Sequence, residues 1–337
     1  MSTRVPLNVL DLASRPHGGT NSDAVAASIR LAQEAERLGF GRFWVAEHHS
    51  MPAIASSAPA VLIAGIAAAT DRIRVGSGGV MLPNHAPLVV AEQFGTLRAL
   101  YGDRIDLGIG RAPGTDGATA MALRRSPEGL GVEDFPQQLL DLFGFFYGGR
   151  SDADPLRSIT AVPGLGDAPQ IWLLGSSGYS AQVAAALGLP FAFAHHFAGE
   201  NTEAALELYR SRFTPGDMLS EPHTMIAVNV IADDDPERVR ALSLPGQLSF
   251  LRMRQGLKPE PVSIEEALAH EFTPLEEEFI ATRNARQAIG TPEEVRDRLS
   301  ALLDSTRADE LMIASGAATV EGRIRSLEVA RQVLEQG

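Results

Sequence analysis

The sequence predicts an α/β fold, a (β/α)8 TIM barrel made by a single domain over residues 1–337. Short β-branched runs alternate with longer amphipathic runs along the whole chain, and eight strand–helix pairs can be counted. No shift in composition marks a linker, and 337 residues suit one large barrel. A doubly wound sheet is the alternative, but it requires no particular number of strands, and no G-x-G-x-x-G motif follows the first strand.

The first four strand–helix pairs occupy the N-terminal part of the chain. Asn21 and Ser22 are candidate caps of the first helix, and Gly39 follows its end. The fourth helix comes only after a long loop that contains glycine and proline. The expected strands are residues 5–12, 42–47, 72–82 and 104–109, and the expected helices are residues 22–38, 57–69, 87–101 and 132–147.

The remaining strands are expected at residues 170–174, 189–194, 224–232 and 310–314, with helices after the fifth and sixth. Thr291, Pro292 and Glu294 begin another helix, because they supply a cap, a first-turn proline and an acid three residues after the cap. Residues 320–334 form the last helix. Residues 233–290 are longer than the connection after a seventh strand requires, so we expect an insertion or lid near the barrel mouth. A peripheral segment without a catalytic role fits this length equally well.

Composition excludes several classes of protein. The chain has no cysteine, which removes disulfides, thiolate zinc sites, iron–sulfur clusters and thiol nucleophiles. Its net charge of −13 argues against a nucleic-acid partner. The longest apolar run, residues 58–69, is shorter than the roughly 20 residues that span a membrane. With no signal peptide in residues 1–12, a cytoplasmic protein is expected.

Histidines gather where the expected strands end, which is where a TIM barrel carries its active site. They are His48, His49, His85, His195 and His196. A metal site is the alternative explanation for such a cluster. Adjacent side chains on a strand point to opposite faces, however, so a His-His pair cannot direct both rings into the barrel mouth. We therefore expect no metal; each histidine taken alone is equally compatible with a hydrogen-bonded structural role.

Glycines also gather at strand ends, in residues 76–79, 108–114 and 175–178. Glycine is poorly suited to a strand interior and usually marks a bulge or a surface that a ligand approaches. The third turn runs directly into a helix, whose N-terminus is a ready phosphate site, and Arg111 could add positive charge. Each turn alone fits an ordinary bulge, loop or cap. Together they indicate a planar ligand with a phosphate tail.

These residues resemble the bacterial luciferase-like flavin monooxygenases, and most closely their non-luminescent members. The resemblance covers nearly the whole chain and depends on the order and spacing of five motifs, at residues 44–49, 74–83, 104–111, 174–181 and 290–295. It implies a barrel, usually a dimer, that uses reduced FMN and O2 through a C4a-peroxyflavin to oxidise a small or medium organic substrate. A separate flavin reductase would supply the reduced FMN. Some relatives use a deazaflavin for hydride transfer instead, and a flavin-binding barrel without turnover is a third hypothesis.

The resemblance also implies roles for individual residues. His48 matches the catalytic histidine, Arg111 matches an arginine that contacts the flavin phosphate, and Gly78 and Gly79 match a cis peptide behind the flavin ring. Gly110 stands where light-emitting members carry a thiol, which argues against luminescence. The phosphate-binding turn is matched by Ser176, Ser177, Gly178 and Ser180, and the candidates for the substrate pocket are Asn84, His85, His195 and His196.

Two further expectations concern a residue next to His48 and a helix on the outside of the barrel. Glu47 is a candidate to orient the imidazole of His48, although strand neighbours point apart. The helix over residues 58–69 is apolar on every face, which predicts that a second subunit covers it in a homodimer. Coverage by the chain's own loops is the alternative.

Overall fold

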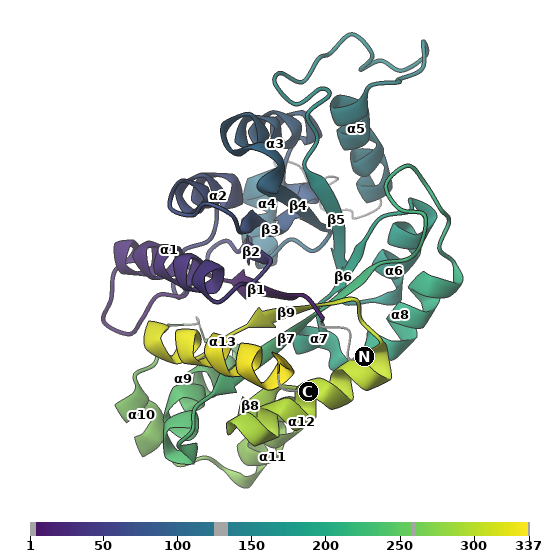
Figure 1. The fold of residues 1–337 in the computed structure, drawn as a ribbon. Helices are drawn as coiled ribbons and strands as arrows, with labels where there is room; N and C mark the ends of the chain where they lie inside the picture. The colour runs from purple at the N-terminus through teal and green to yellow at the C-terminus, as the bar shows by residue number, and fades with distance from the viewer. Residues whose placement is uncertain (1–4, 125–133, 258–259, 336–337) are drawn as a thin grey trace.

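A closed ring of eight parallel strands forms the centre of the molecule, as the sequence predicts (Figure 1). The computed structural model describes residues 5–124, 134–257 and 260–335. The ring runs β6-β5-β4-β3-β2-β1-β9-β7 and closes through β6 and β7. Its strands are β1 (Leu7–Asp11), β2 (Arg42–Val45), β3 (Arg74–Met81), β4 (Ile105–Gly110), β5 (Gln170–Gly175), β6 (Phe191–Phe193), β7 (Thr224–Ala232) and β9 (Glu310–Ala314).

A short strand outside the ring, β8 (Ala288–Gly290), corrects the predicted strand count. It pairs in parallel with β7, with Ala288 opposite Val230. The strand expected at residues 310–314 therefore closes the ring but is the ninth along the chain. Three residues are too few to show an alternating pattern, so periodicity cannot detect such a strand.

Helices surround the ring, and α12 begins at the predicted cap, Thr291, in a capping box with Glu294. The cap of α1 is Thr20, in a capping box with Asp23, rather than the predicted Asn21 or Ser22. The outer helices are α1 (Asn21–Arg37), α2 (Pro59–Ala68), α3 (Pro87–Tyr101), α5 (Phe135–Tyr147), α6 (Gly178–Ala186), α8 (Thr202–Ser211), α12 (Pro292–Thr306) and α13 (Val320–Glu335). Short helical turns are η1 (Leu82–Asn84), η2 (Gly102–Arg104), α7 (His195–Ala198) and η5 (Gly199–Asn201).

Two connections contain helices whose bounds are not predicted from the sequence. The loop after β4 includes α4 (Gly117–Arg124), and residues 132–133 of the expected fourth helix lie outside the described residues. Residues 233–290 form α9 (Pro236–Arg254), α10 (Ile264–Ala269) and α11 (Pro274–Asn284) before β8. Phe250 of α9 and Phe279 of α11 stack with ring centroids 5.9 Å apart, which joins these two helices.

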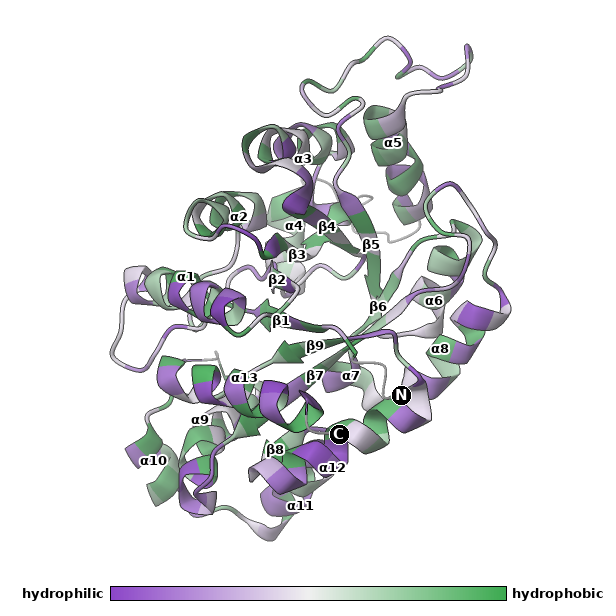
Figure 2. Ribbon diagram, in the orientation of Figure 1, coloured by the Kyte–Doolittle hydropathy of each residue, from purple (hydrophilic) through white to green (hydrophobic). Residues whose placement is uncertain are grey.

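The main core lies between the strands and the outer helices, and the strands are correspondingly coloured as hydrophobic in Figure 2. A smaller apolar layer fills the inside of the ring. Its large members are Leu10, Trp44, Trp172, Met225 and Met312. The barrel is thus a packed body rather than a pore, as is usual for this fold.

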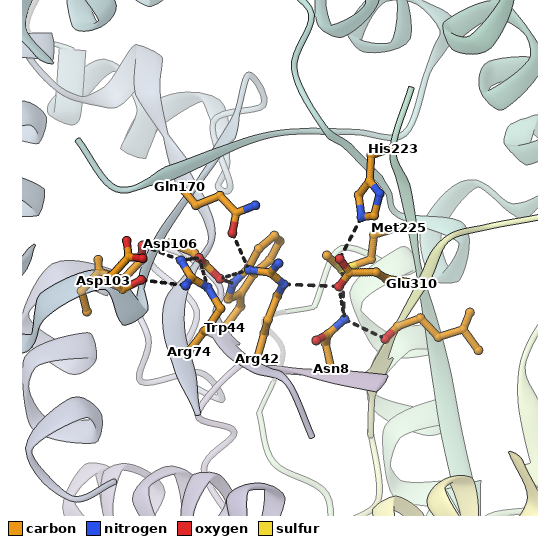
Figure 3. A network of polar contacts seen from close by, with 12 residues as sticks. Asn8, Arg42, Trp44, Arg74, Asp103, Asp106, Gln170, His223, Met225 and Glu310 are labelled. Carbon is orange, nitrogen blue, oxygen red and sulfur yellow. Dashed lines mark hydrogen bonds and ion pairs between the residues drawn. The ribbon is translucent and has the colours of Figure 1, made fainter. Parts of the chain in front are cut away.

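A polar network closes the end of the barrel where the strands begin (Figure 3). Arg42 donates to Asp106 at 2.7 Å and to Glu310 at 3.3 Å. Arg74 also donates to Asp106, and Asn8 and His223 each lie 2.8 Å from Glu310. Because every charge here is paired, this end is built for stability, which leaves the opposite end for chemistry.

In the described part of the chain, no helix is both long and apolar enough to cross a membrane.

Candidate active site

A cavity of about 230 Å³ opens where the parallel strands end. The three glycine-bearing strand ends meet in it, as the sequence predicts: β3 contributes Gly78, β4 contributes Gly110 and β5 contributes Gly175. His48, which follows β2, lines the same cavity. The ends of four strands therefore enclose one space.

The glycines of β3 and β4 also let the two strands approach closely. The pairing register shifts between Gly78 and Val80, so a bulge is present, and the Gly78–Gly79 peptide bond is cis, as the resemblance implies. A Cβ on Gly108 would lie 2.1 Å from the carbonyl oxygen of Ser77. The glycines at these strand ends therefore have two explanations: the strands pack closely, and no side chain fills the cavity at these positions.

His48 lines the cavity, and one of its ring nitrogens is unsatisfied. Its Nδ1 is buried and has no hydrogen-bond partner among the described residues. Burial lowers the pKa of His48 below 6.5, with Glu47 acting in the opposite direction, so the ring is neutral at pH 7. A buried nitrogen without a protein partner is what a bound ligand would satisfy.

Glu47 does not hydrogen-bond to His48, which corrects the expected orienting role. Its fully buried carboxylate instead accepts from Nε2 of His49 at 2.8 Å and from Nε2 of His85 at 2.9 Å. The amide of Asn84 and the backbone N–H of Met81 also donate to it. Burial opposes ionisation, but these donors lower the pKa of Glu47 overall. The carboxylate therefore joins the loop after β2, which contains His48, to the loop after β3.

Positive charge and free donors lie on the other side of the cavity. The guanidinium of Arg111 stacks 4.1 Å from the ring centroid of Tyr179, and no acidic side chain among the described residues pairs with it. Ser177 is the N-cap of α6 but makes no side-chain capping bond, so its hydroxyl is free to bind a ligand. Ser176 and Ser180 line the cavity beside it. A phosphate fits this combination of guanidinium, hydroxyls and helix N-terminus.

The remaining predicted residues are divided between the cavity and its surroundings. His196 lines the cavity, donates from Nδ1 to the carbonyl of Ala227 at 3.0 Å, and is neutral because burial lowers its pKa to about 4. His195 bonds to Thr202 and to the carbonyl of Arg286 outside the cavity wall. Four other predicted residues are not among those that line the cavity: Gly79, Asn84, His85 and Gly178.

The apolar lining of the cavity is not predicted from the sequence. Met81, Phe193 and Phe197 belong to it, and Phe197 is largely exposed although it is a large aromatic residue. Its position directly after the His-His pair is the one available signal. Nothing in the local sequence distinguishes Met81 or Phe193 from ordinary strand residues.

The donor set suits a planar group with a phosphate better than a metal ion. Both His48 and Arg111 line a largely apolar wall. Over the residues that the structure describes, no group of three or more His, Asp or Glu side chains could hold a metal ion. The residues present therefore fit a planar cofactor that carries a phosphate group.

Comparison with known sequences gives a family match. The family model described as luciferase-like monooxygenase matches residues 8–310. The chain is 46% identical over 331 residues to the uncharacterized protein YvbT of Bacillus subtilis, covering 97% of this chain and 96% of that one. It is 43% identical over 336 residues to a luciferase-like monooxygenase of Escherichia coli, covering 98% of each. The N-acetyl-S-alkylcysteine monooxygenase of Bacillus subtilis is 34% identical over 311 residues, covering 92% of each chain.

Solved structures agree on the fold. The crystal structure of apo-MsnO8 superposes with a TM-score of 0.87 at 37% identity and covers 99% of both chains. The oxygenating constituent of 3,6-diketocamphane monooxygenase of Pseudomonas putida, in complex with FMN, has a TM-score of 0.73 at 17% identity and covers 99% of both. An F420-dependent secondary alcohol dehydrogenase has a TM-score of 0.71 at 14% identity and covers 98% of both. The last two likenesses concern the fold alone.

Proposed function

This chain belongs to the luciferase-like monooxygenase family, and from that premise we propose that it uses reduced FMN and O2 to oxidise a small or medium organic substrate. The observation that carries the proposal is a cavity lined by both His48, whose buried Nδ1 has no partner among the described residues, and Arg111, whose guanidinium pairs with no described acid. The relative named N-acetyl-S-alkylcysteine monooxygenase supports a small substrate.

With reduced FMN bound, each part of the cavity would have its own role. Bound reduced FMN supplies the activation of O2. Arg111, Ser177 and the N-terminus of α6 bind the phosphate, since a chain of net charge −13 must hold a dianion by local donors. His48, neutral at pH 7, accepts or donates a proton at Nδ1. The apolar wall excludes water from the reacting atoms.

Flavin binding tests the proposal directly. Titration with FMN should quench flavin fluorescence, and Arg111→Ala should weaken binding by about 10–100-fold, the loss of one or two charge-assisted hydrogen bonds. Arg72→Ala is the matched control, because Arg72 is exposed before β3 at the opposite end of the barrel. Absence of binding to both oxidised and reduced FMN would contradict the proposal.

The same titration separates the other hypotheses. Preferential binding of a deazaflavin, with no consumption of O2, would replace the oxygenase with a hydride-transfer enzyme. Normal flavin binding with rates unchanged by His48→Ala would indicate a barrel without turnover. Oxygen consumption that requires an added flavin reductase supports the proposal that a separate enzyme supplies reduced FMN.

We also propose that the chain is a homodimer. The helix α2 is apolar throughout, and Val61 on its surface is 73% exposed. Val89 and Leu100 of the adjacent α3 are exposed as well. An apolar surface on neighbouring outer helices is best explained by burial against a second copy.

A further inference from the structure

A second cavity of about 160 Å³ adjoins the proposed flavin cavity. It lies among β7, β9, α9 and α11 and shares Leu12, His196 and Phe197 with the first cavity. A third hollow of about 350 Å³ shares His48 and Phe197 with the first. We call the second and third cavities together the outer chamber. Phe197 and Leu12 border all three spaces, so a molecule in the outer chamber lies next to the catalytic candidate His48.

Arg283 of α11 lines both parts of the outer chamber. Its guanidinium stacks 4.4 Å from the ring centroid of Phe250, and it pairs with no acidic side chain of the described residues. The other arginines of the chamber are neutralised, Arg15 by Glu260 and Arg323 by Asp11. A partly buried cation without a counter-ion is costly unless a ligand supplies the negative charge.

Two hydrogen-bond donors that line the same chamber have no acceptor in the described parts of the chain. One is the buried Nε2 of Gln287, whose Oε1 accepts from Asn229 at 2.7 Å. Gln287 is only 2% exposed, so bulk water does not solvate this amide. The hydroxyl of Ser315 is likewise buried and unpartnered. A cation and two free donors around one cavity form a suitable site for an anion.

Packing of α9 on α11 does not by itself account for this arrangement. Arg254 stacks on Phe279 at 4.6 Å in the same way that Arg283 stacks on Phe250, and the two rings stack on each other. Arg254, however, is exposed and lines neither part of the chamber. The stacking therefore does not explain why the guanidinium of Arg283 lines the chamber without a counter-ion.

We propose that Arg283, Gln287 and Ser315 bind the carboxylate of an organic-acid substrate, whose apolar part extends along Phe197 toward His48. The proposal rests on the proposed oxygenase function and names the substrate class of that site. A guanidinium matches a carboxylate through two parallel hydrogen bonds, and the amide and hydroxyl satisfy its remaining lone pairs. The apolar side chains of Phe197, Phe250 and Met253 suit an alkyl or aryl body.

Calorimetric titration with hexanoate and with hexanamide tests the proposal. The two probes have nearly the same shape and differ in charge, and each is measured with and without saturating FMN. We expect hexanoate to bind the wild-type protein at least 10-fold more tightly than hexanamide. Arg283→Gln should weaken hexanoate by about 10–100-fold and leave hexanamide unchanged, whereas the matched control Arg254→Gln should change neither.

Several results would overturn the proposal. They are an absence of hexanoate binding to the wild type, equal binding of the two probes, hexanoate binding that Arg283→Gln does not change, and weaker FMN binding in Arg283→Gln, which would assign the guanidinium to the cofactor. The FMN titration reports on the proposed function separately. Normal FMN binding without carboxylate recognition removes only this inference, and carboxylate binding without FMN binding removes only the flavin function.

Discussion

Glu47 accepts a hydrogen bond from Nε2 of His85 at 2.9 Å, and this contact joins the loop after β2 to the loop after β3. The same carboxylate binds His49, and Asn84 connects it to the carbonyl of Pro113 in the loop after β4. Three loops at the mouth of the barrel are thus held by one buried anion. His48 and Arg111 belong to these loops, so the position of both depends on it.

Glu47→Gln should lower the free energy of unfolding by about 1–3 kcal/mol, because the amide presents a donor where the protein also presents donors. Denaturant unfolding measures the change. Glu321→Gln is the matched control: Glu321 makes a single ion pair with Arg30, its side chain is 62% exposed, and its loss should cost less than about 0.5 kcal/mol. Equal stability of Glu47→Gln and the wild type would contradict the role of this anion.

The sequence predicts the ring of strands and the shared glycine-lined cavity because both follow from local patterns. A run of β-branched residues forms a strand, and parallel strands bring their ends together. It does not predict the partners of Glu47, since His85 reaches the carboxylate only through the conformation of η1. Arg283 is missed for a similar reason. It lies on α11, more than 200 residues after His48, and no periodicity shows that the two residues border one cavity.

His48→Gln should reduce the oxidation rate by about 10²–10⁴-fold while FMN affinity changes little, because the side chain acts on a proton rather than on the phosphate. The pH dependence is a second measurement. Burial lowers the pKa of His48, so a rate that needs the neutral ring should fall at acidic pH with a midpoint below pH 6.5. His223→Gln, at the other end of the barrel, should keep that profile. A midpoint at or above pH 6.5 would contradict this assignment.

Gly108→Ala should destabilise the barrel by roughly 1–3 kcal/mol or more, because the new Cβ would lie 2.1 Å from a backbone oxygen that cannot rotate away. Thermal and denaturant unfolding measure the loss. Gly117→Ala tests whether any added methyl group has this effect: Gly117 is exposed on α4 with nothing within 4 Å, and the change should stay within about 0.5 kcal/mol. If the two variants are equally stable, the close approach of β3 and β4 does not require glycine.

Val61→Asp should convert the proposed dimer to a monomer, since a charge on the apolar face of α2 cannot be buried against a second copy without cost. Light scattering should give about twice 35.9 kDa for the wild type and 35.9 kDa for the variant. Leu275→Asp is the matched control, because Leu275 is 76% exposed on α11, away from α2. A monomeric wild type would remove the dimer.

The pair of His223 and Glu310 should make stability depend on pH. The hydrogen bond from His223 to Glu310 raises the pKa of His223 above 6.5 in the folded state. A raised histidine pKa contributes stability that is complete below pH 6.5 and is lost as the pH rises through the folded value. Burial opposes ionisation of Glu310, but His223 and Arg42 lower its pKa to about 2, below the usual 4.5, so its contribution is present above pH 4.5 and is lost toward pH 2.

Both groups therefore stabilise the fold fully between about pH 4.5 and 6.5, and His223→Gln should lower the Tm more at pH 6 than at pH 8.5. Melting curves of the variant and the wild type across that interval measure the difference. His17→Gln serves as a control for the loss of a histidine ring that contacts the carbonyl of Pro261 rather than a carboxylate. A His223→Gln effect of the same size at both pH values would show that the ring contributes by packing and not by charge.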